Sequence, residues 1–270
     1  KLGRYVICQN PDGMATVDSP EEIRVLDPAC GTGNLLTAAF DLLYEIYLDA
    51  NYRPDVIPEL ILSKNLFGYD IDARAVDAAK AILIAKAHQK QSHFFRRGIE
   101  PQIRAFTEDD HPDAGLYGSL IRELDETKYH VILANPPYMG SKHFSKAMSA
   151  WAKKHYPDSS RDLCSMFIER GLEMVVPGGM IAMITMESWM FLTSFERLRR
   201  RIIEDQTIIT LAHLGSGAVI STTAFVIADT APPHAFQGVY FRLGDSKNKD
   251  RDLHTSILEY RAANTDWGVA

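Results

Sequence analysis

The stretch IRVLDPACGTGN, residues 23–34, decides the fold of this chain. Its first half is short and apolar, as expected of a buried strand. Gly31 and Gly33 then allow a tight turn, and Asn34 is a suitable N-cap for residues 35–48, where apolar side chains recur at helical spacing. We therefore predict a strand, a glycine turn and a helix, the unit from which parallel α/β sheets are built.

The same alternation continues along the chain. Strand-like apolar runs occupy residues 66–70, 103–106, 129–134, 180–185, 207–214, 222–227 and 239–243. Helical patterns cover residues 73–90, 118–126, 163–175 and 194–204, and a turn is expected at 177–179. This order predicts an α/β fold with a doubly wound, mostly parallel sheet, and the helix-poor region after residue 207 predicts an antiparallel strand at its C-terminal end.

Length and composition indicate one large domain. The 270 residues are 46% hydrophobic, which is enough for a full core, and no internal repeat or clear domain boundary is visible. We expect this domain to span residues 1–245. The polar residues 246–270 are expected to be a linker or the start of a further domain.

Charge, cysteine content and hydropathy exclude several classes of protein. A net charge of -6 and a pI near 5.9 argue against a protein that covers nucleic acid with its whole surface, although a local basic patch can still bind phosphate. Cys8, Cys30 and Cys164 lack the spacing of disulfides or zinc ligands, and we expect no metal site. Since no apolar run reaches the ~18 residues that span a bilayer, and no signal peptide is visible, we expect a soluble, cytoplasmic protein without membrane contact.

The turn after the first strand is the expected ligand cradle, because ligands of open α/β sheets collect at the carboxyl ends of the strands. We call residues 27–33 the cofactor turn. Its expected cofactor-binding residues are Asp27, Pro28, Ala29, Cys30, Gly31 and Gly33.

A second part of the cradle is expected at the end of the next strand. Asp70 can accept both hydroxyls of a ribose, with Ile71 beside it, whereas Asp72 is better explained as a helix N-cap. Asp113 is a candidate acceptor for an adenine amino group, and Asp109 and Asp110 compete for that role. The chain lacks the third glycine of dinucleotide-binding turns and the Gly-Lys-Ser/Thr of nucleotide-phosphate loops, so the pattern favours S-adenosylmethionine over NAD or ATP.

The tetrapeptide Asn135-Pro136-Pro137-Tyr138, directly after the strand-like run 129–134, indicates methylation of a planar amino group. The lone pair of such a nitrogen is delocalised into its ring and must be localised before it can attack. The side-chain oxygen of Asn135 and the carbonyl of Pro136, held by proline's fixed φ, can do this by accepting hydrogen bonds from the amino group. Tyr138 offers a flat face on which an extruded base can stack.

Other candidate substrate-binding residues carry weaker signals. Trp189 and Phe225, with Phe191, are candidates for the second face of a base sandwich, although core packing explains each of them as well. Lys142 is well placed for a phosphate contact. A basic cluster at 197–201 is better explained as a solvated helix face.

The residues quoted above resemble the gamma-type, N6-adenine-specific DNA methyltransferases, whose DPACGTG and NPPY motifs are both present at 27–33 and 135–138. A longer resemblance, to the PglX methyltransferases of BREX phage-defence systems, runs through residues 40–44, 57–62, 65–72, 135–140 and 188–192. The resemblance implies a Rossmann-like class I fold that uses S-adenosylmethionine. It also implies double-stranded DNA with a flipped adenine as substrate, marking of host DNA, and other phage-defence proteins as partners.

The resemblance also has limits. The family carries a Thr-Pro segment before the first strand and a large target-recognition part after the catalytic domain, and its link corresponding to residues 215–221 is longer. We therefore expect this chain to be a catalytic fragment, whose DNA recognition sequence is set elsewhere.

Three alternatives remain open from the sequence. Protein-glutamine methyltransferases share the Asn-Pro-Pro-Tyr motif, and RNA methyltransferases also act on exocyclic amines. The third is a non-catalytic cofactor-binding subunit.

Overall fold

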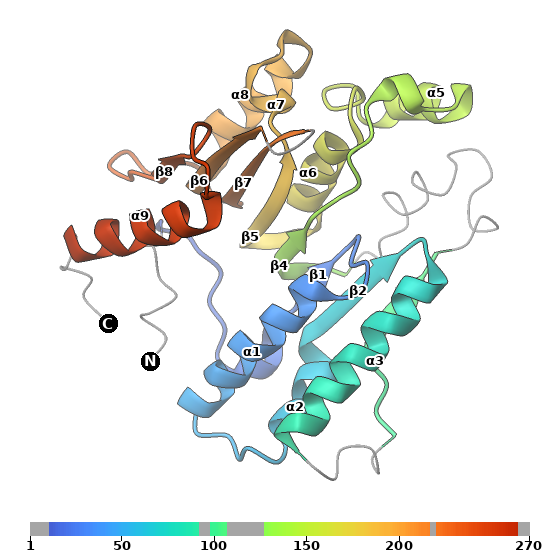
Figure 1. The fold of residues 1–270 in the computed structure, drawn as a ribbon, viewed down its shortest axis with the longest axis vertical. Helices are drawn as coiled ribbons and strands as arrows, with labels where there is room; N and C mark the ends of the chain where they lie inside the picture. The colour runs from blue at the N-terminus through green and yellow to red at the C-terminus, as the bar shows by residue number, and fades with distance from the viewer. Residues whose placement is uncertain (1–10, 92–97, 107–126, 217–219, 264–270) are drawn as a thin grey trace.

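The computed structural model describes residues 11–91, 98–106, 127–216 and 220–263 (Figure 1). In this part of the chain, strands β1 to β8 are Val25–Asp27, Leu66–Asp70, Gln102–Ala105, Tyr129–Ala134, Val175–Met186, Thr207–Ser216, Ser221–Ala228 and Val239–Arg242. The α-helices are α1 (Asn34–Asp49), α2 (Ile57–Leu60), α3 (Ala73–Lys90), α5 (Lys146–His155), α6 (Leu163–Met174), α7 (Ser188–Phe191), α8 (Glu196–Asp205) and α9 (Lys249–Ala263). Shorter helical turns are η2 (Pro20–Glu22), η3 (Ile61–Asn65), η6 (Ser141–His143) and η7 (Thr193–Phe195).

The strands form one mixed sheet in the order β3-β2-β1-β4-β5-β7-β6-β8. β1 pairs in parallel with both β2 and β4, so the winding reverses between β1 and β4. β7 is antiparallel to β5 and β6, which confirms the predicted α/β fold with an antiparallel strand near its C-terminal end. The residues that follow β1, β2 and β4 therefore meet at one edge of the sheet, which we call the carboxyl edge.

Alternate residues of the strands pack into two cores, one on each face of the sheet. Val25 and Ile103 pack with residues of α1 and α3, while Leu26 and Ile132, both 0% exposed, pack with residues of α6 and α8. Figure 1 shows α1 and α3 beside the half of the sheet that holds β1 and β2. Apolar burial on both faces fixes the strand ends, and hence the carboxyl edge, in place.

Two local predictions are wrong. Gly33, at φ +84°, occupies the N-cap position of α1, and Asn34 is the first helical residue. β5 begins at Val175 and continues through the expected turn at 177–179. It can do so because Gly178 adopts φ +77°, in a space so narrow that an added Cβ would lie 2.3 Å from the Gly13 carbonyl oxygen.

Other predictions concern segments outside the described residues and the C-terminal stretch. The expected helix 118–126 and Cys8 lie outside the described residues. Part of the stretch expected to be a linker or a further domain forms α9, in which no residue is buried. None of the helices in the described ranges combines the length and apolarity needed to cross a bilayer.

Candidate active site

The cofactor turn follows β1 directly and is tied to β2 by its backbone. The Gly33 N–H donates to the Cys30 carbonyl at 2.8 Å, and the Cys30 N–H donates to the Tyr69 carbonyl at 2.9 Å. Gly31 and Gly33 have φ values of +52° and +84°, which favour glycine. A Cβ added to Gly33 would lie 3.1 Å from Cβ of Ala79 in α3, whereas one added to Gly31 would meet nothing within 4 Å. Gly33 thus allows close helix packing, while Gly31 borders open space that a ligand can enter.

Asp70, the last residue of β2, holds the cofactor turn from the neighbouring strand. Its Oδ2 accepts a hydrogen bond from the Gly31 N–H at 2.7 Å, and its Oδ1 accepts one from the Asp72 N–H at 3.0 Å. Each carboxylate oxygen has more than one acceptor site, so both can still accept a ribose hydroxyl. The contact with Gly31 is a positioning role that the sequence did not predict.

The other residues of the turn differ in burial. Pro28 and Cys30 are buried and Ala29 is half-buried. Burial raises the pKa of the Cys30 thiol well above its usual value, so this side chain is a neutral packing group.

Asp27 is a buried carboxyl group at the end of β1. It is 1% exposed, and its Oδ1 accepts a hydrogen bond from the Ala29 N–H at 3.1 Å. Burial, opposed by this hydrogen bond and reinforced by the nearby charge of Asp70, raises the pKa of Asp27 to about 7. A cation bound beside the turn would favour the charged form of Asp27.

We expect Asp27→Asn to stabilise the cofactor-free protein at high pH. Because the pKa of Asp27 is higher in the folded than in the unfolded chain, the stability linked to its proton is full below about pH 4 and is lost as pH rises through about 7. The variant avoids this loss, so the margin by which its free energy of unfolding exceeds that of the wild type should be roughly 3 kcal/mol larger at about pH 8 than at about pH 5. Urea unfolding at both pH values measures this, with exposed Asp12→Asn as the control. The same difference at both pH values would contradict the assigned pKa.

The residues that follow β4 form a second loop, 135–140, which we call the catalytic loop. Asn135 is exposed and Pro136 is buried, while Pro137 and Tyr138 are half-buried. The Tyr138 hydroxyl donates a hydrogen bond to Oδ1 of Asn135 at 2.8 Å. Burial raises the pKa of Tyr138 above its usual value, so the hydroxyl remains a donor. This bond orients the Asn135 side chain before any substrate binds.

The start of α6 holds the catalytic loop from behind. The Leu163 N–H donates to the Met139 carbonyl at 2.9 Å, and Gly140 forms a β-bridge with Asp162. The Cys164 thiol lies 3.4 Å from the Pro137 carbonyl oxygen and 3.8 Å from that of Pro136. Burial raises the pKa of this thiol well above its usual value, so it is a neutral, weak donor.

One apolar cluster joins the two halves of the site. Its buried residues come from α5 and α6 and the chain between them, and include Trp151 and Phe167. Ala29 of the cofactor turn, Ile71 beyond β2 and Met139 of the catalytic loop all pack against it. The two loops are thus held by the same set of side chains, which limits their movement relative to each other.

Two of the predicted substrate-binding residues are core residues in the structure. Trp189 is 4% exposed and donates from its indole N–H to Oγ1 of Thr185 at 3.1 Å. Phe225 is 3% exposed, and its ring lies edge-on to that of Trp189 at 5.3 Å between centroids. Core packing therefore accounts for both residues, and their role as the second stacking face stays a prediction.

The remaining candidates have varied placements. Lys142 is exposed in η6, two residues beyond the catalytic loop. Asp113, with Asp109 and Asp110, lies outside the described residues. Within the described ranges, no group of three or more His, Cys, Asp or Glu side chains is arranged to hold a metal ion.

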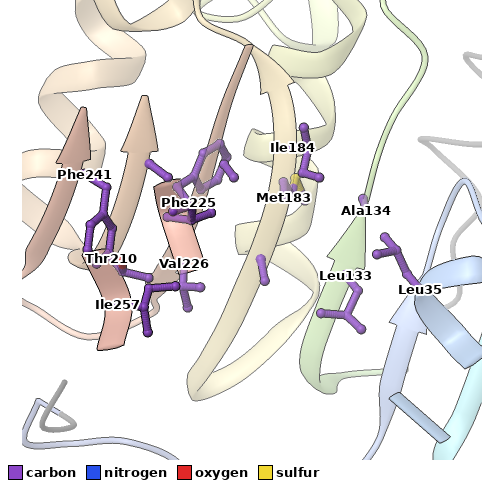
Figure 2. A pocket seen from close by; sticks show the side chains of 14 residues that line it. Leu35, Leu133, Ala134, Met183, Ile184, Thr210, Phe225, Val226, Phe241 and Ile257 are labelled. Atoms are coloured by element: carbon purple, nitrogen blue, oxygen red, sulfur yellow. The ribbon is translucent and has the colours of Figure 1, made fainter. Parts of the chain in front are cut away.

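An apolar hollow of about 270 Å³ lies on the face of the sheet that carries α1 and α9. Figure 2 shows its labelled side chains, which come from strands, such as Ile184 and Val226, and from the helices α1 (Leu35) and α9 (Ile257). The hollow begins at Leu35, close to the cofactor turn. Its lining is almost entirely aliphatic and aromatic, so it lacks the polar groups that would orient an adenosine or a charged amino acid, and we do not assign it to the cofactor.

The strand order, with its reversal between β1 and β4 and its antiparallel β7, is the fold of one class of protein, the class I S-adenosylmethionine-dependent methyltransferases. A putative member of this class from Listeria monocytogenes matches 88% of this chain and 64% of its own, with a TM-score of 0.54 and 14% identity. The ATP-dependent Type ISP restriction-modification enzyme LlaBIII, solved bound to DNA, matches 92% of this chain and 20% of its own, with a TM-score of 0.67 and 15% identity. At these identities the likeness shows the fold.

Within this class, the chain belongs to the Eco57I restriction-modification methylase family, whose model matches residues 64–220. Adenine-specific methyltransferase BrxX of Escherichia coli O9:H4 (strain HS) is 29% identical over 328 residues, covering 86% of this chain and 27% of the relative. Adenine-specific methyltransferase PglX of Lacticaseibacillus casei (strain Zhang) is 29% identical over 317 residues, covering 88% and 26%. The predicted likeness to PglX is confirmed, and the chain spans about a quarter of the length of these curated relatives.

Proposed function

We propose that the protein to which this chain belongs transfers a methyl group from S-adenosylmethionine to N6 of adenine in double-stranded DNA. The observation that carries the proposal is the placement of the catalytic loop and the cofactor turn at the ends of the adjacent strands β4 and β1. The names of the relatives, both adenine-specific methyltransferases, support adenine as the substrate.

The residues of the cofactor turn fit the proposed cofactor. The open space beside Gly31 lets a cofactor approach the backbone of the turn, and the Asp70 carboxylate has acceptor sites left for ribose hydroxyls. The buried Asp27 can balance a positive charge. When bound, S-adenosylmethionine would supply an electrophilic methyl group on a positively charged sulfur.

The catalytic loop supplies the groups that prepare the acceptor nitrogen. Asn135 Oδ1 already accepts one hydrogen bond from Tyr138 and, as an amide oxygen, can accept a second from the adenine amino group. The Pro136 carbonyl can accept the other amino hydrogen, because the donor beside it in the described residues, the Cys164 thiol, is weak and lies 3.8 Å away. Two fixed acceptors draw the nitrogen out of conjugation with its ring, which makes its lone pair available.

The target adenine has to leave the DNA stack to reach this loop. Tyr138 provides a ring on which the extruded base can stack. We further propose that the modified sites mark host DNA in the cytosol, where other phage-defence proteins are partners of the full-length protein. The likeness to BrxX and PglX supports this setting.

We expect Tyr138→Phe to be a mild change and Tyr138→Ala a severe one. Phenylalanine keeps the stacking face and loses only the bond that orients Asn135, so the rate of methyl transfer should fall about 3- to 10-fold. Alanine also loses base stacking, worth roughly 1–3 kcal/mol, and the rate should fall a further factor of about 5 to 150. Single-turnover transfer, with 2-aminopurine fluorescence at the target position, separates the two effects. Equal losses in both variants would show that the hydroxyl, not the ring face, is what the reaction needs.

Transfer of tritium from labelled S-adenosylmethionine tests the function itself. The full-length protein is offered double-stranded DNA, RNA and a glutamine-containing protein substrate in parallel. We expect label in DNA, at N6 of adenine. Label that appears in protein or RNA and not in DNA would replace the proposal by one of the other methyltransferase types that share this loop.

A further inference from the structure

The chain between the catalytic loop and α6 is strongly basic within an acidic protein. Residues 140–161 contain five Lys and Arg residues and one Asp, a net charge of +4, although the whole chain carries -6. The rest of the chain therefore carries -10. The five cations, which we call the basic patch, are Lys142, Lys146, Lys153, Lys154 and Arg161.

All five side chains of the basic patch are exposed. None of them forms an ion pair with another residue in the described ranges, whereas Lys64, Lys86 and Arg53, elsewhere on the surface, pair with Glu21, Asp41 and Asp55. The patch therefore presents charge that the protein itself does not neutralise.

Helix stability explains only part of this charge. Lys153 and Lys154 lie in the last turn of α5, where cations interact favourably with the helix dipole. Lys146, in contrast, is the first residue of α5, where a cation is unfavourable, and Lys142 and Arg161 lie outside the helix. A role in folding does not account for these three.

The basic patch is fixed in position relative to the catalytic loop. The apolar face of α5 anchors it, with Met148, Trp151 and Ala152 buried in the cluster that also packs against the catalytic loop. The Ser141 N–H donates to the Arg161 carbonyl at 2.8 Å, so the two ends of the segment meet beside Gly140. Figure 1 shows the chain running from the end of β4 to α5, beyond the carboxyl edge.

We propose that the basic patch binds the phosphate backbone of the DNA duplex that carries the target adenine. This rests on the proposed function: a duplex whose adenine reaches Asn135 must pass beside the catalytic loop, and the patch begins two residues after that loop ends. The unpaired cations complement a polyanion, and contacts of this kind position a duplex without reading its sequence.

The test uses the full-length protein and a fluorescein-labelled duplex of mixed sequence, with binding followed by anisotropy at several salt concentrations. We expect the triple variant Lys146→Gln/Lys153→Gln/Lys154→Gln to bind the duplex at least about 10-fold more weakly at low salt. Each lysine–phosphate interaction that the variant removes should reduce the slope of log affinity against log salt by about 0.9, so the slope should fall by roughly 2 to 3. The matched control removes the same charge from other lysines, as Lys80→Gln/Lys90→Gln/Lys247→Gln, and should leave the slope within about 0.5 of the wild type.

Two further measurements separate charge from folding and from the proposed function. The charge-preserving variant Lys146→Arg/Lys153→Arg/Lys154→Arg should restore both affinity and slope. The Tm of the glutamine triple variant is also measured, because an unchanged Tm shows that its weaker binding comes from lost charge and not from a folding defect.

If the wild type methylates DNA but the glutamine triple variant keeps the wild-type slope, the basic patch does not bind phosphate and this inference fails alone. If the patch variant instead loses binding to RNA and not to DNA, the assigned partner is wrong. If the wild type transfers no label to DNA, the proposed function fails and the inference fails with it.

Discussion

Asn135→Ala is expected to reduce methyl transfer to DNA about 100- to 1,000-fold, with the affinity for S-adenosylmethionine nearly unchanged. Asn135 is exposed at the end of β4, and its side chain is held by the Tyr138 hydroxyl rather than by the cofactor turn. Its removal therefore deletes one acceptor for the adenine amino group without disturbing the cofactor cradle. Single-turnover transfer measures the rate, and isothermal titration calorimetry measures cofactor affinity.

A second asparagine-to-alanine variant serves as the control for Asn135→Ala. Asn248→Ala changes an asparagine ahead of α9, whose Oδ1 accepts from the Arg251 N–H, and should leave both quantities near their wild-type values. A loss of cofactor affinity in Asn135→Ala comparable to its loss of rate would mean that the catalytic loop has been assigned to the wrong role.

Asp70→Ala is expected to have the opposite effect, weakening cofactor binding about 30-fold or more before it affects the transfer step. Two losses combine: the ribose loses its carboxylate acceptor, and the Gly31 N–H loses the partner that holds the cofactor turn. Calorimetric titration with S-adenosylmethionine, followed by transfer rates at saturating cofactor, separates affinity from rate.

Asp72→Ala is the control for this variant, because Asp72 lies two residues away and has a different task. Its side chain caps α3 by accepting from the Arg74 N–H at 2.9 Å, as the sequence predicted. Loss of a cap should lower the free energy of unfolding and change cofactor affinity much less than Asp70→Ala does. Equal losses of affinity in the two variants would remove the special role of Asp70.

The parts of the fold that the sequence predicted carry local signals. The glycines of residues 23–34 and the alternation of apolar side chains are enough to place β1, the cofactor turn and α1, and the helix expected over 73–90 is found at Ala73–Lys90. The catalytic loop is recognisable because Asn135, Pro136, Pro137 and Tyr138 stand in one uninterrupted run after an apolar strand.

The elements that were missed have weak or short patterns. α5 has only ten residues and buries only Met148, Trp151 and Ala152, so its apolar positions cover less than two helical turns. α7 has four residues, too few to show a helical period. Trp189 lies in it, and no local signal tells which of its neighbouring aromatic residues faces the core.

The contacts that complete the site depend on the order of the strands. Gly31 and Asp70 are 39 residues apart, and their hydrogen bond exists because β1 and β2 are neighbours in the sheet. The thiol of Cys164 reaches the catalytic loop because α6 packs against β5, the strand that pairs with β4. Such contacts follow from tertiary structure, so a reading of motifs identifies the chemistry of the site and misses the groups that position it.

The most direct test of the central claim is long-read sequencing of modified adenines in cells with and without the gene. We expect N6-methyladenine at a defined sequence in cells that express the full-length protein, and its loss both in cells without the gene and in cells that express Asn135→Ala. The same pattern of adenine modification in all three strains would contradict the account.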